Sequence, residues 1–386
     1  MKLKVFSYPL LRIGIIGGGQ LGKMTAQTAK RMGFYVTVLD PVPNCPAKQI
    51  ADVQIEGSLY DPEKLRALAQ VSDVITFDVE HIDTQTLKQL HQEGTRIYPS
   101  PYLLETIQDK LKQKQVLTQH HVPVSNYQQV DELTAEILAT LSFPVVQKAR
   151  TGGYDGKGVV ILNSLADADK ILHTPSLLEE YIDFEKELAV MVARTQQGEI
   201  ACYPVVEMVF DSQTNICDIV AAPAHIAPEI AERAQQVAIQ AVEALDGVGI
   251  FGVEMFLTRQ GQVLVNEIAP RPHNSGHYTI EACTTCQFEQ LIRIISELPL
   301  GETRLLTPVV MANLLGEIGY TGKPLIEGLE TVLTIPGLTF HLYGKEITQP
   351  SRKMGHITVI DTELDRALVK IHQAKASLKI KGEVVL

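Results

Sequence analysis

The sequence has few cysteines and no long apolar run. Its five cysteines are odd in number and scattered along the chain, which argues against a disulfide framework. The longest apolar runs, residues 13–16 and 71–77, are interrupted and strand-sized, far below the roughly 20 residues that span a bilayer. Residues 1–12 contain no apolar stretch followed by a small-residue cleavage site, so no signal peptide is expected. These absences predict a cytoplasmic protein that does not contact membranes.

Positive charge is also scarce. The chain has 34 lysines and arginines against 45 acidic residues, which gives a net charge of −11 at pH 7. An acidic chain repels polyanions at long range, so nucleic acid is not an expected partner. Small phosphorylated substrates remain compatible with this charge, because local lysines and backbone N–H groups can bind them.

Two of the cysteines, Cys283 and Cys286, form a C-x-x-C pattern. A structural zinc site would need a second such pair or a histidine pair nearby in the sequence, and there is none. A thioredoxin-like redox pair is the alternative, but no strand leads directly into this pattern. We therefore interpret both cysteines as packing residues, three positions apart on a helix that runs on from Thr279.

At 386 residues the chain is long enough for two or three domains. Its first hundred residues alternate short apolar strands with helical patterns. This order predicts a parallel sheet with right-handed crossovers. The expected strands are 12–17, 35–40 and 73–77, the expected helices are 20–32 and 61–70, and a helix over 103–120 follows.

The pattern changes between about residues 140 and 300. A helix is expected over 228–245, because Pro228 lies in its first turn and Gly247 follows its end. The last segment, from about residue 300, contains short strands and turns. The whole is predicted to be an α/β protein of three parts. Expected strands in the middle part are 143–149, 158–162 and 187–193.

A first glycine-rich loop matches G-x-G-x-x-G at Gly17, Gly19 and Gly22. It follows a strand and opens a helix, and Asp40 ends the next strand. This pattern is typical of dinucleotide-binding domains, with the acidic residue on a ribose, so an NAD-dependent oxidoreductase is one hypothesis. Glycines and N–H groups at a helix start bind any anion, however, and a phosphorylated substrate would fit the same loop.

A second glycine-rich loop, residues 151–158, has four glycines in seven residues and lies between two expected strands. Such a loop can fold over a phosphate tail, with Lys157 and backbone N–H groups as donors. It is not a P-loop, because no G-x-x-x-x-G-K-[ST] pattern and no following helix are present. The alternatives are a mobile hairpin turn here and a plain surface lysine at Lys148, but Lys148 lies in an otherwise apolar run and is expected to contact phosphate.

Two carboxylates are expected to face one another across a hairpin. If residues 260–261 form its turn, Glu254 lies opposite Glu267. Paired carboxylates in apolar strands repel one another, and a divalent cation between them would relieve the repulsion, with Asn266 as a neutral oxygen ligand. Oxygen ligands suit Mg²⁺ on nucleotide phosphates, which predicts phosphoryl transfer. The alternative is that both side chains reach solvent on an open sheet face.

Three motifs, residues 266–277, 151–158 and 352–356, resemble those of the N5-carboxyaminoimidazole ribonucleotide synthetase family, in the ATP-grasp superfamily. The similarity covers about residues 12–365, and the first motif separates it from the formate-dependent glycinamide ribonucleotide transformylases. The resemblance implies a Rossmann-like pre-ATP-grasp domain, an ATP-grasp domain with a glycine-rich lid, and a β-rich C-terminal domain that completes the substrate site. Their expected bounds are 1–100, 101–298 and 299–386.

The resemblance implies that ATP, bicarbonate and 5-aminoimidazole ribonucleotide react to give the N5-carboxylated ribonucleotide, ADP and phosphate in purine biosynthesis. Bicarbonate would attack the γ-phosphorus, and the carboxyphosphate formed would carboxylate the amine, directly or through trapped CO₂. Carboxyphosphate is unstable in water, so the lid would also protect it. Mg²⁺, or Mn²⁺ in its place, and a homodimer are implied as well.

The resemblance also implies roles for individual residues. Catalytic roles fall to Arg271, which would hold bicarbonate or carboxyphosphate, and to Lys353, Tyr154 and Asp155. The metal ligands would be Glu254 and Glu267. The ribonucleotide would contact Gly19, Gln20, Leu21, Glu80, His273, Asn274, Arg352 and Lys353, beside Tyr154 and Asp155. The segment 178–182 would meet the adenine, with Glu179 and Ile182 in contact, and Glu187 would face the ribose. In full, ATP would contact Lys110, Lys148, Gly153, Tyr154, Asp155, Gly156, Lys157, Gly158, Val159, Glu179, Glu180, Tyr181, Ile182, Glu187, Asn266 and Glu267.

Three positions depart from the family pattern. Lys110 stands where an arginine is usual, which keeps the charge but loses bidentate geometry. His81 stands where an asparagine is usual, and Phe210 where a histidine is common. The rival hypotheses explain less: an oxidoreductase accounts for one loop only, and a non-catalytic nucleotide-binding regulator would need a damaged carboxylate pair.

Overall fold

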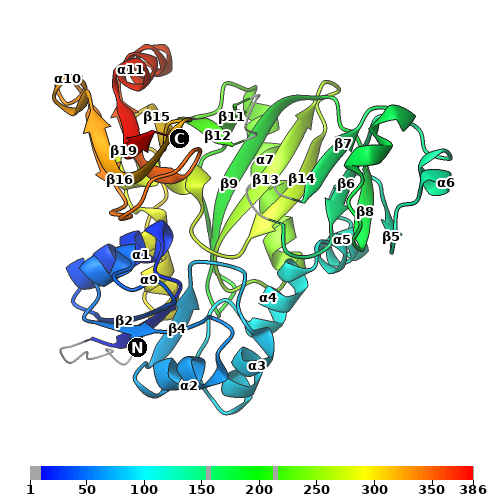
Figure 1. Ribbon diagram of the computed structural model, residues 1–386. Coiled ribbons are helices and arrows are strands. Elements are labelled where there is room, and N and C mark those ends of the chain that lie inside the picture. Colours follow the sequence, from blue (N-terminus) through cyan, green and yellow to red (C-terminus); the bar gives the residue numbers. More distant parts are fainter. Residues whose placement is uncertain (1–9, 154–157, 212–215, 386) are drawn as a thin grey trace.

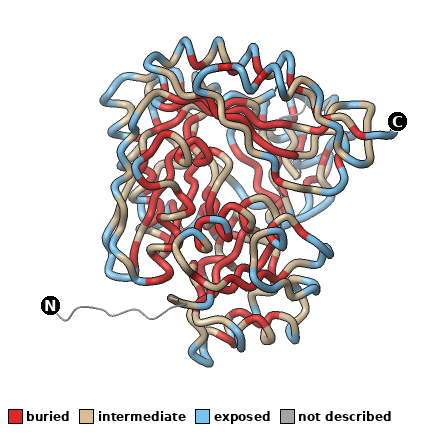
Figure 2. Tube along the Cα trace, turned by 90° about the vertical axis from the view of Figure 1, so that its left-hand side faces the viewer, coloured by how far each residue is buried: buried red, intermediate tan, exposed pale blue. Residues whose placement is uncertain are grey.

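The computed structural model describes residues 10–153, 158–211 and 216–385. Within them, a parallel sheet, a small antiparallel sheet and a large antiparallel sheet form the body, and a two-stranded ribbon lies near the C-terminus (Figure 1). Figure 2 shows the buried backbone running through the sheets, with exposed turns on the outside. None of the described helices is both long and apolar enough to cross a bilayer.

The N-terminal part is the predicted parallel sheet, with one strand more than expected. Its strand order is β3-β2-β1-β4. The additional strand, β3, is only four residues long and none of them is fully buried, so its apolar pattern, Val53 and Ile55, is short. Asp61 caps helix α2 by accepting the Glu63 N–H at 2.9 Å. The elements are β1 (Arg12–Ile16), α1 (Gln20–Arg31), β2 (Tyr35–Asp40), η1 (Pro46–Gln49), β3 (Val53–Glu56), α2 (Pro62–Gln70), β4 (Val74–Phe77) and α3 (Thr84–Gln92).

The single helix predicted over 103–120 is wrong. Two helices, α4 (Pro101–Gln108) and α5 (Lys110–Gln119), meet at Asp109. Asp109 has extended backbone angles, and its carboxylate accepts the Leu111 N–H at 3.0 Å. Arg150 pairs with the same carboxylate. A capping aspartate with an ion-pair partner therefore ends one helix and begins the next.

The small antiparallel sheet has the order β5-β8-β6-β7 and carries the second glycine-rich loop between β6 and β7. It lies beside the large sheet, at the right of Figure 1. Its elements are β5 (Tyr127–Val130), α6 (Ala135–Leu138), β6 (Val145–Ala149), β7 (Val159–Leu162), η2 (Leu165–Lys170) and β8 (Ser176–Glu180).

The large antiparallel sheet has the order β14-β13-β9-β11-β12-β15-β18-β17, with β10 paired to β9. Strands from residues 299–386 thus extend a sheet that begins in residues 101–298. Its elements before residue 299 are β9 (Phe184–Arg194), β10 (Ile200–Cys202), β11 (Val206–Phe210), β12 (Cys217–Ala222), α7 (Pro228–Ala244), β13 (Gly249–Thr258), β14 (Val263–Ala269), η3 (Asn274–Gly276), α8 (Thr279–Ala282) and α9 (Gln287–Ile295).

Strand β9 has two buried faces because its successive side chains alternate between two cores. Val190 and Val192 pack in the cluster that includes the apolar face of α7. Met191 and Ala193 pack in another cluster, which includes residues of α9 and of the parallel sheet. The large sheet is therefore covered on both faces at its centre, and the second cluster joins it to the N-terminal part.

The C-terminal segment closes the fold with a helix packed on the end of the large sheet. Buried Ala367, Ile371 and Ala374 of α11 lie one helical turn apart and share a core with Val310 and Ala312 of β15. The elements are β15 (Val309–Leu315), β16 (Tyr320–Glu327), α10 (Leu329–Val332), β17 (Leu338–Leu342), β18 (Lys353–Ile360), α11 (Leu364–Ser377) and β19 (Lys379–Val385).

The helix predicted through the C-x-x-C pattern is also wrong. Helix α8 ends at Ala282, Cys283 is extended, and Cys286 caps α9 by accepting the Glu289 N–H at 3.5 Å. All five cysteines are free thiols, as expected, and burial raises the pKa of Cys283 to about 12. The pair is therefore a buried link between two short helices, in keeping with a packing role.

Candidate active site

The hairpin of β13 and β14 places Glu254 directly opposite Glu267, as predicted. The route to this pairing differs from the prediction. Leu257 pairs with Val263, so the connection is one residue longer than a two-residue turn, and a bulge at Asn266 restores the register. Successive residues of a regular strand point to opposite faces, whereas a bulge re-aims one side chain. Asn266 and Glu267 therefore both reach the same group of lysines.

The two carboxylates have opposite electrostatic environments. Burial, and then the charge of Glu267, raises the pKa of Glu254 well above its usual range. Lys110 lowers the pKa of Glu267 from 2.7 Å away. His273 Nε2 also lies 3.3 Å from Glu254 Oε1. Without a cation, one carboxylate of the pair is ionised and the other tends to hold a proton.

This donor set fits a divalent cation shared with a bound phosphate. Two carboxylates and an amide are hard oxygen ligands, and Mg²⁺ in proteins is usually held by one or two carboxylates together with substrate phosphates. Within the described ranges, no cluster of three or more His, Cys, Asp or Glu residues is arranged to hold a metal alone. The raised pKa of Glu254 also fits, because a bound cation would favour its ionised form.

A buried network of two lysines and one glutamate adjoins the carboxylate pair. Lys148 Nζ lies 3.0 Å from Glu179 Oε2 and donates to Asn266 Oδ1 at 2.8 Å. Lys114 donates to Ser125 Oγ at 2.7 Å and lies 3.3 Å from the same Glu179 oxygen. Glu179 was expected at the adenine, yet its side chain, only 4% exposed, lies between these lysines.

Lys114 and Ser125 were not among the expected site residues. A signal for Lys114 was present, because Lys110 and Lys114 are four positions apart and share one face of α5. The Lys110 N–H donates to Arg150 O at 2.9 Å, which anchors the start of α5 to the end of β6. This contact places the Lys110 side chain beside Glu267 and Lys148 beside Asn266.

The segment after β8 contains the other residues expected near adenine and ribose. Glu180 and Tyr181 are exposed and Ile182 is half-buried. Glu187 on β9 is half-buried, and burial raises its pKa to about 7 against the opposing charge of Lys148. Of these residues, Glu187 lies close enough to Lys148 for the lysine to lower its pKa.

The loop 271–277 joins the carboxylate pair to the N-terminal part. Arg271 Nε lies 2.8 Å from Glu80 Oε1, beyond the end of β4. The buried Gln287 side chain accepts the His273 N–H at 2.8 Å and donates to His273 O at 2.9 Å. A Cβ on Gly252 would lie 2.6 Å from His273 Cβ, so only glycine permits this close approach. Gln287 is a further positioning residue that no local motif marks.

The remaining expected substrate residues come from two segments, the loop after β14 and residues 352–353. Asn274 and Asn313 form a reciprocal amide pair at 2.8 and 2.9 Å. Lys353 is the first residue of β18, and its positive charge acts to lower the pKa of Glu254. Arg352 donates to Ile347 O at 2.6 Å.

Asp40, the residue expected to bind a ribose if the first glycine-rich loop held a dinucleotide, instead forms hydrogen bonds that support the loop. The Asp40 carboxylate accepts the Gly18 N–H at 2.7 Å and the Val42 N–H at 2.8 Å. An aspartate engaged in this way supports the loop and is not held out to a ribose. The side chain of Leu21 packs with Phe288 and Tyr343, so Leu21 can offer only its backbone to a ligand. Gly19 and Gln20 are half-buried at the start of α1.

The predicted lid is described only at its two ends. Gly153 precedes the gap, and Gly158, with φ +77°, leads into Val159 of β7. The expected contacts Tyr154, Asp155, Gly156 and Lys157 lie outside the described residues. The paired strands β6 and β7 on either side of the gap are those expected from the sequence.

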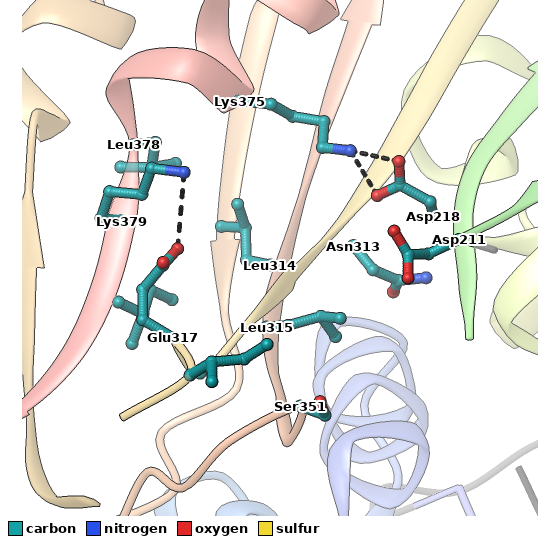
Figure 3. Close-up of a pocket in the computed structure, with 13 residues that line it drawn as sticks. Asp211, Asp218, Asn313, Leu314, Leu315, Glu317, Ser351, Lys375, Leu378 and Lys379 are labelled. Atoms are coloured by element: carbon teal, nitrogen blue, oxygen red, sulfur yellow. Dashed lines mark hydrogen bonds and ion pairs between the residues drawn. The ribbon is translucent and has the colours of Figure 1, made fainter. Parts of the chain in front are cut away.

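A hollow lined in part by Asn313 and Ser351 lies between the large sheet and the C-terminal ribbon (Figure 3). Its two lysines are each engaged by a carboxylate: Lys375 pairs with Asp218, and Lys379 Nζ lies 3.5 Å from Glu317. The charges that line it are therefore largely neutralised, and it lacks the concentration of basic groups found around Glu267.

The buried network gives a prediction about stability. Glu179→Gln should lower the free energy of unfolding by about 3–5 kcal/mol, because two buried lysines would lose their counter-charge. The shift in the urea unfolding midpoint would measure this loss. Glu180→Gln is the matched control: this neighbouring side chain is exposed, and its change should stay within about 0.5 kcal/mol. Equal midpoints for both variants would contradict the prediction.

The sequence matches three domain families. Residues 10–108 match the ribonucleotide synthetase preATP-grasp domain, and residues 115–288 match the ATP-grasp domain. Residues 309–370 match the phosphoribosylaminoimidazole carboxylase C-terminal domain. The predicted ATP-grasp fold is therefore confirmed.

Individual proteins agree with this assignment. The chain is 43% identical over 363 residues to the N5-carboxyaminoimidazole ribonucleotide synthase of Synechococcus elongatus, which covers 91% of this chain and 90% of that protein. The crystal structure of the Thermotoga maritima N5-carboxyaminoimidazole ribonucleotide synthetase is 55% identical, with a TM-score of 0.90 over 97% of this chain and 100% of that one. An Aspergillus clavatus N5-carboxyaminoimidazole synthase, in complex with ADP and 5-aminoimidazole ribonucleotide, is 36% identical, with a TM-score of 0.87 over 95% and 98%. These likenesses decide against the NAD-dependent oxidoreductase, and this chain belongs to the N5-carboxyaminoimidazole ribonucleotide synthase family of ATP-dependent ligases.

Proposed function

We propose that the protein uses ATP and bicarbonate to carboxylate the amine of 5-aminoimidazole ribonucleotide in purine biosynthesis, as a cytoplasmic homodimer. The observation that carries this proposal is the Glu254–Glu267 pair, which lies between lysines on one side and the Arg271–His273 loop on the other. The lysines suit a nucleotide triphosphate, and the loop leads toward the first glycine-rich loop. The Aspergillus clavatus relative was crystallised in complex with ADP and 5-aminoimidazole ribonucleotide, which supports the proposal that this protein binds both a nucleotide and the ribonucleotide.

On the nucleotide side, Lys110 and Lys148 would bind the phosphates. Glu254, Glu267 and Asn266 would hold Mg²⁺, or Mn²⁺ in its place, and the ion would neutralise charge on the phosphates during transfer. Lys110 lies 2.7 Å from Glu267, and Lys148 lies 2.8 Å from the Asn266 oxygen, so both cations already lie beside the proposed ligands. Glu187 and residues 180–182 would face the nucleoside.

On the acceptor side, Arg271 would hold bicarbonate and then the carboxyl group of carboxyphosphate. A bicarbonate oxygen attacks the γ-phosphorus, and the bond to the ADP oxygen breaks. The ribonucleotide amine then forms a bond to the carboxyl carbon while phosphate leaves and the amine loses a proton. His273, Asn274, Arg352 and Lys353, with the first glycine-rich loop, would hold the ribonucleotide, and residues 153–159 would exclude water.

A coupled assay of ADP release tests the proposal. ADP release should require both 5-aminoimidazole ribonucleotide and bicarbonate, because the site binds an amine acceptor beside the phosphate-transfer centre, and formate should not alter the rate. Turnover driven by formate with glycinamide ribonucleotide would instead identify the transformylase activity of the sister family. Omitting the metal ion provides the blank for both reactions.

A further inference from the structure

The carboxylate of Asp78 lies inside the first glycine-rich loop. Asp78 directly follows β4 and is 5% exposed. Its Oδ2 accepts the Gly22 N–H at 2.8 Å, in the first turn of α1. A Cβ on Gly17 would lie 1.7 Å from Asp78 Oδ1, and one on Gly22 would lie 2.9 Å from Oδ2. These glycines therefore allow the loop to wrap closely around a carboxylate from another strand.

One oxygen of this carboxylate has no partner. Asp78 Oδ1 is buried and makes no hydrogen bond within the described residues, and Asp78 forms no ion pair there. A buried polar atom without a partner is uncommon and calls for an explanation. Protonation at Oδ1 would remove the charge of Asp78 while Oδ2 keeps its bond to Gly22.

Few charged or titratable groups face Asp78, and they shift its pKa in opposite directions. Asp40 at the end of β2 and the Cys45 thiol before η1 lie on one side, and Arg271 approaches from the loop after β14. Arg271 also pairs with Glu80. Burial raises the pKa of Asp78 to about 7, with a contribution from Asp40, against the Gly22 and Gly19 N–H groups and Arg271.

A phosphate bound at the first glycine-rich loop would change the protonation of the Asp78 carboxylate. The N–H groups of Gln20 and Leu21 begin α1, where a helix has no internal acceptors for them and binds anions. A phosphate dianion at these N–H groups would repel an ionised carboxylate enclosed by the same loop. The neutral form of Asp78 would therefore be favoured when the phosphate is bound.

We infer that Asp78 is a positioning residue that takes up a proton at Oδ1 when the phosphate of the ribonucleotide binds to the first glycine-rich loop. This inference rests on the proposed function. The proton comes from solvent, and no covalent bond of the substrate changes. Binding of 5-aminoimidazole ribonucleotide thereby becomes coupled to pH through a residue that need not touch it.

Isothermal titration calorimetry measures this proton directly. The full chain is titrated with 5-aminoimidazole ribonucleotide at pH 8 in two buffers of different ionisation enthalpy. The phosphate, with a second pKa near 6, is already a dianion there and contributes no uptake. With a pKa of about 7, Asp78 is roughly 10% protonated in the free protein at pH 8, so wild type should take up about 0.9 proton per site.

The isosteric Asp78→Asn variant should bind the ribonucleotide with less than about 0.2 proton taken up, because its amide is neutral and its oxygen can still accept the Gly22 N–H. Its affinity should change little between pH 7 and 9, where that of wild type should fall roughly tenfold per pH unit above the pKa. Asp61→Asn is the matched control, because the Asp61 carboxylate caps helix α2 away from the loop. This variant should keep the wild-type proton uptake.

Equal uptake by wild type and Asp78→Asn would overturn the inference while leaving the proposed function intact. A wild-type chain that does not bind the ribonucleotide at all would overturn both. A second measurement needs no variant: wild-type uptake should fall to about half a proton at pH 7. A wild-type chain that binds the ribonucleotide at pH 8 without proton uptake would also overturn the inference.

Discussion

Glu267→Ala should lower kcat for ADP release by about 100- to 1,000-fold. Glu267 faces Glu254 across the hairpin and lies 2.7 Å from Lys110, so its removal takes away one proposed metal ligand and leaves the lysine without its partner. Phosphoryl transfer depends chiefly on neutralising and positioning the phosphates, and losing one such charge contact lowers rates by about 100- to 1,000-fold. ADP release is measured with saturating 5-aminoimidazole ribonucleotide and bicarbonate over a range of Mg²⁺ concentrations.

Two further variants separate a metal role from a general defect. Glu267→Gln keeps the size of the side chain and removes its charge, and it should raise the Mg²⁺ concentration needed for half-maximal rate. Glu302→Gln, an exposed glutamate paired with Arg304, should behave as wild type. Full turnover by Glu267→Ala with an unchanged Mg²⁺ requirement would remove the metal role from this residue.

The elements of the fold that were predicted correctly carry regular local patterns. Short apolar runs marked the buried strands β1, β2 and β4, and the helix over α7 was predicted to within a residue. Strand β3 was missed because its four residues offer only two apolar side chains, neither of them fully buried. The break at Asp109 was missed although a capping aspartate was visible, because helix-forming residues lie on both sides, such as Leu104 and Gln108 before it and Lys110 after it.

The parts of the candidate site that lie in contiguous sequence motifs could be predicted. The contacts between residues far apart in the sequence could not. The Glu254–Glu267 pairing was predicted from a two-residue turn at 260–261. The connection is one residue longer, and only the bulge at Asn266, which no local residue signals, makes the pairing correct. Glu179 was expected at the nucleoside and lies between Lys114 and Lys148. Such a network depends on how three separate elements pack, which spacing along the chain does not encode.

Lys148→Met should lower kcat/KM for ATP by about 100- to 1,000-fold while the protein stays folded. Lys148 is the only lysine in the described residues that contacts both Asn266, at 2.8 Å, and Glu179, at 3.0 Å. It therefore joins the proposed metal site to the buried network, and an oriented charge in a partly buried site has a larger effect than one in water. Glu179 would retain Lys114 as a counter-charge at 3.3 Å, which is why unfolding is not expected.

The measurement is the initial rate of ADP release as ATP is varied, together with the thermal unfolding midpoint. Lys148→Arg should recover part of the rate, because the positive charge returns with a different shape. Lys170→Met, at an exposed lysine paired with Asp167, should match wild type in both measurements. A folded Lys148→Met protein with a wild-type KM for ATP and a wild-type kcat would show that the phosphates bind elsewhere, and the nucleotide would then have to be placed by Lys110 alone.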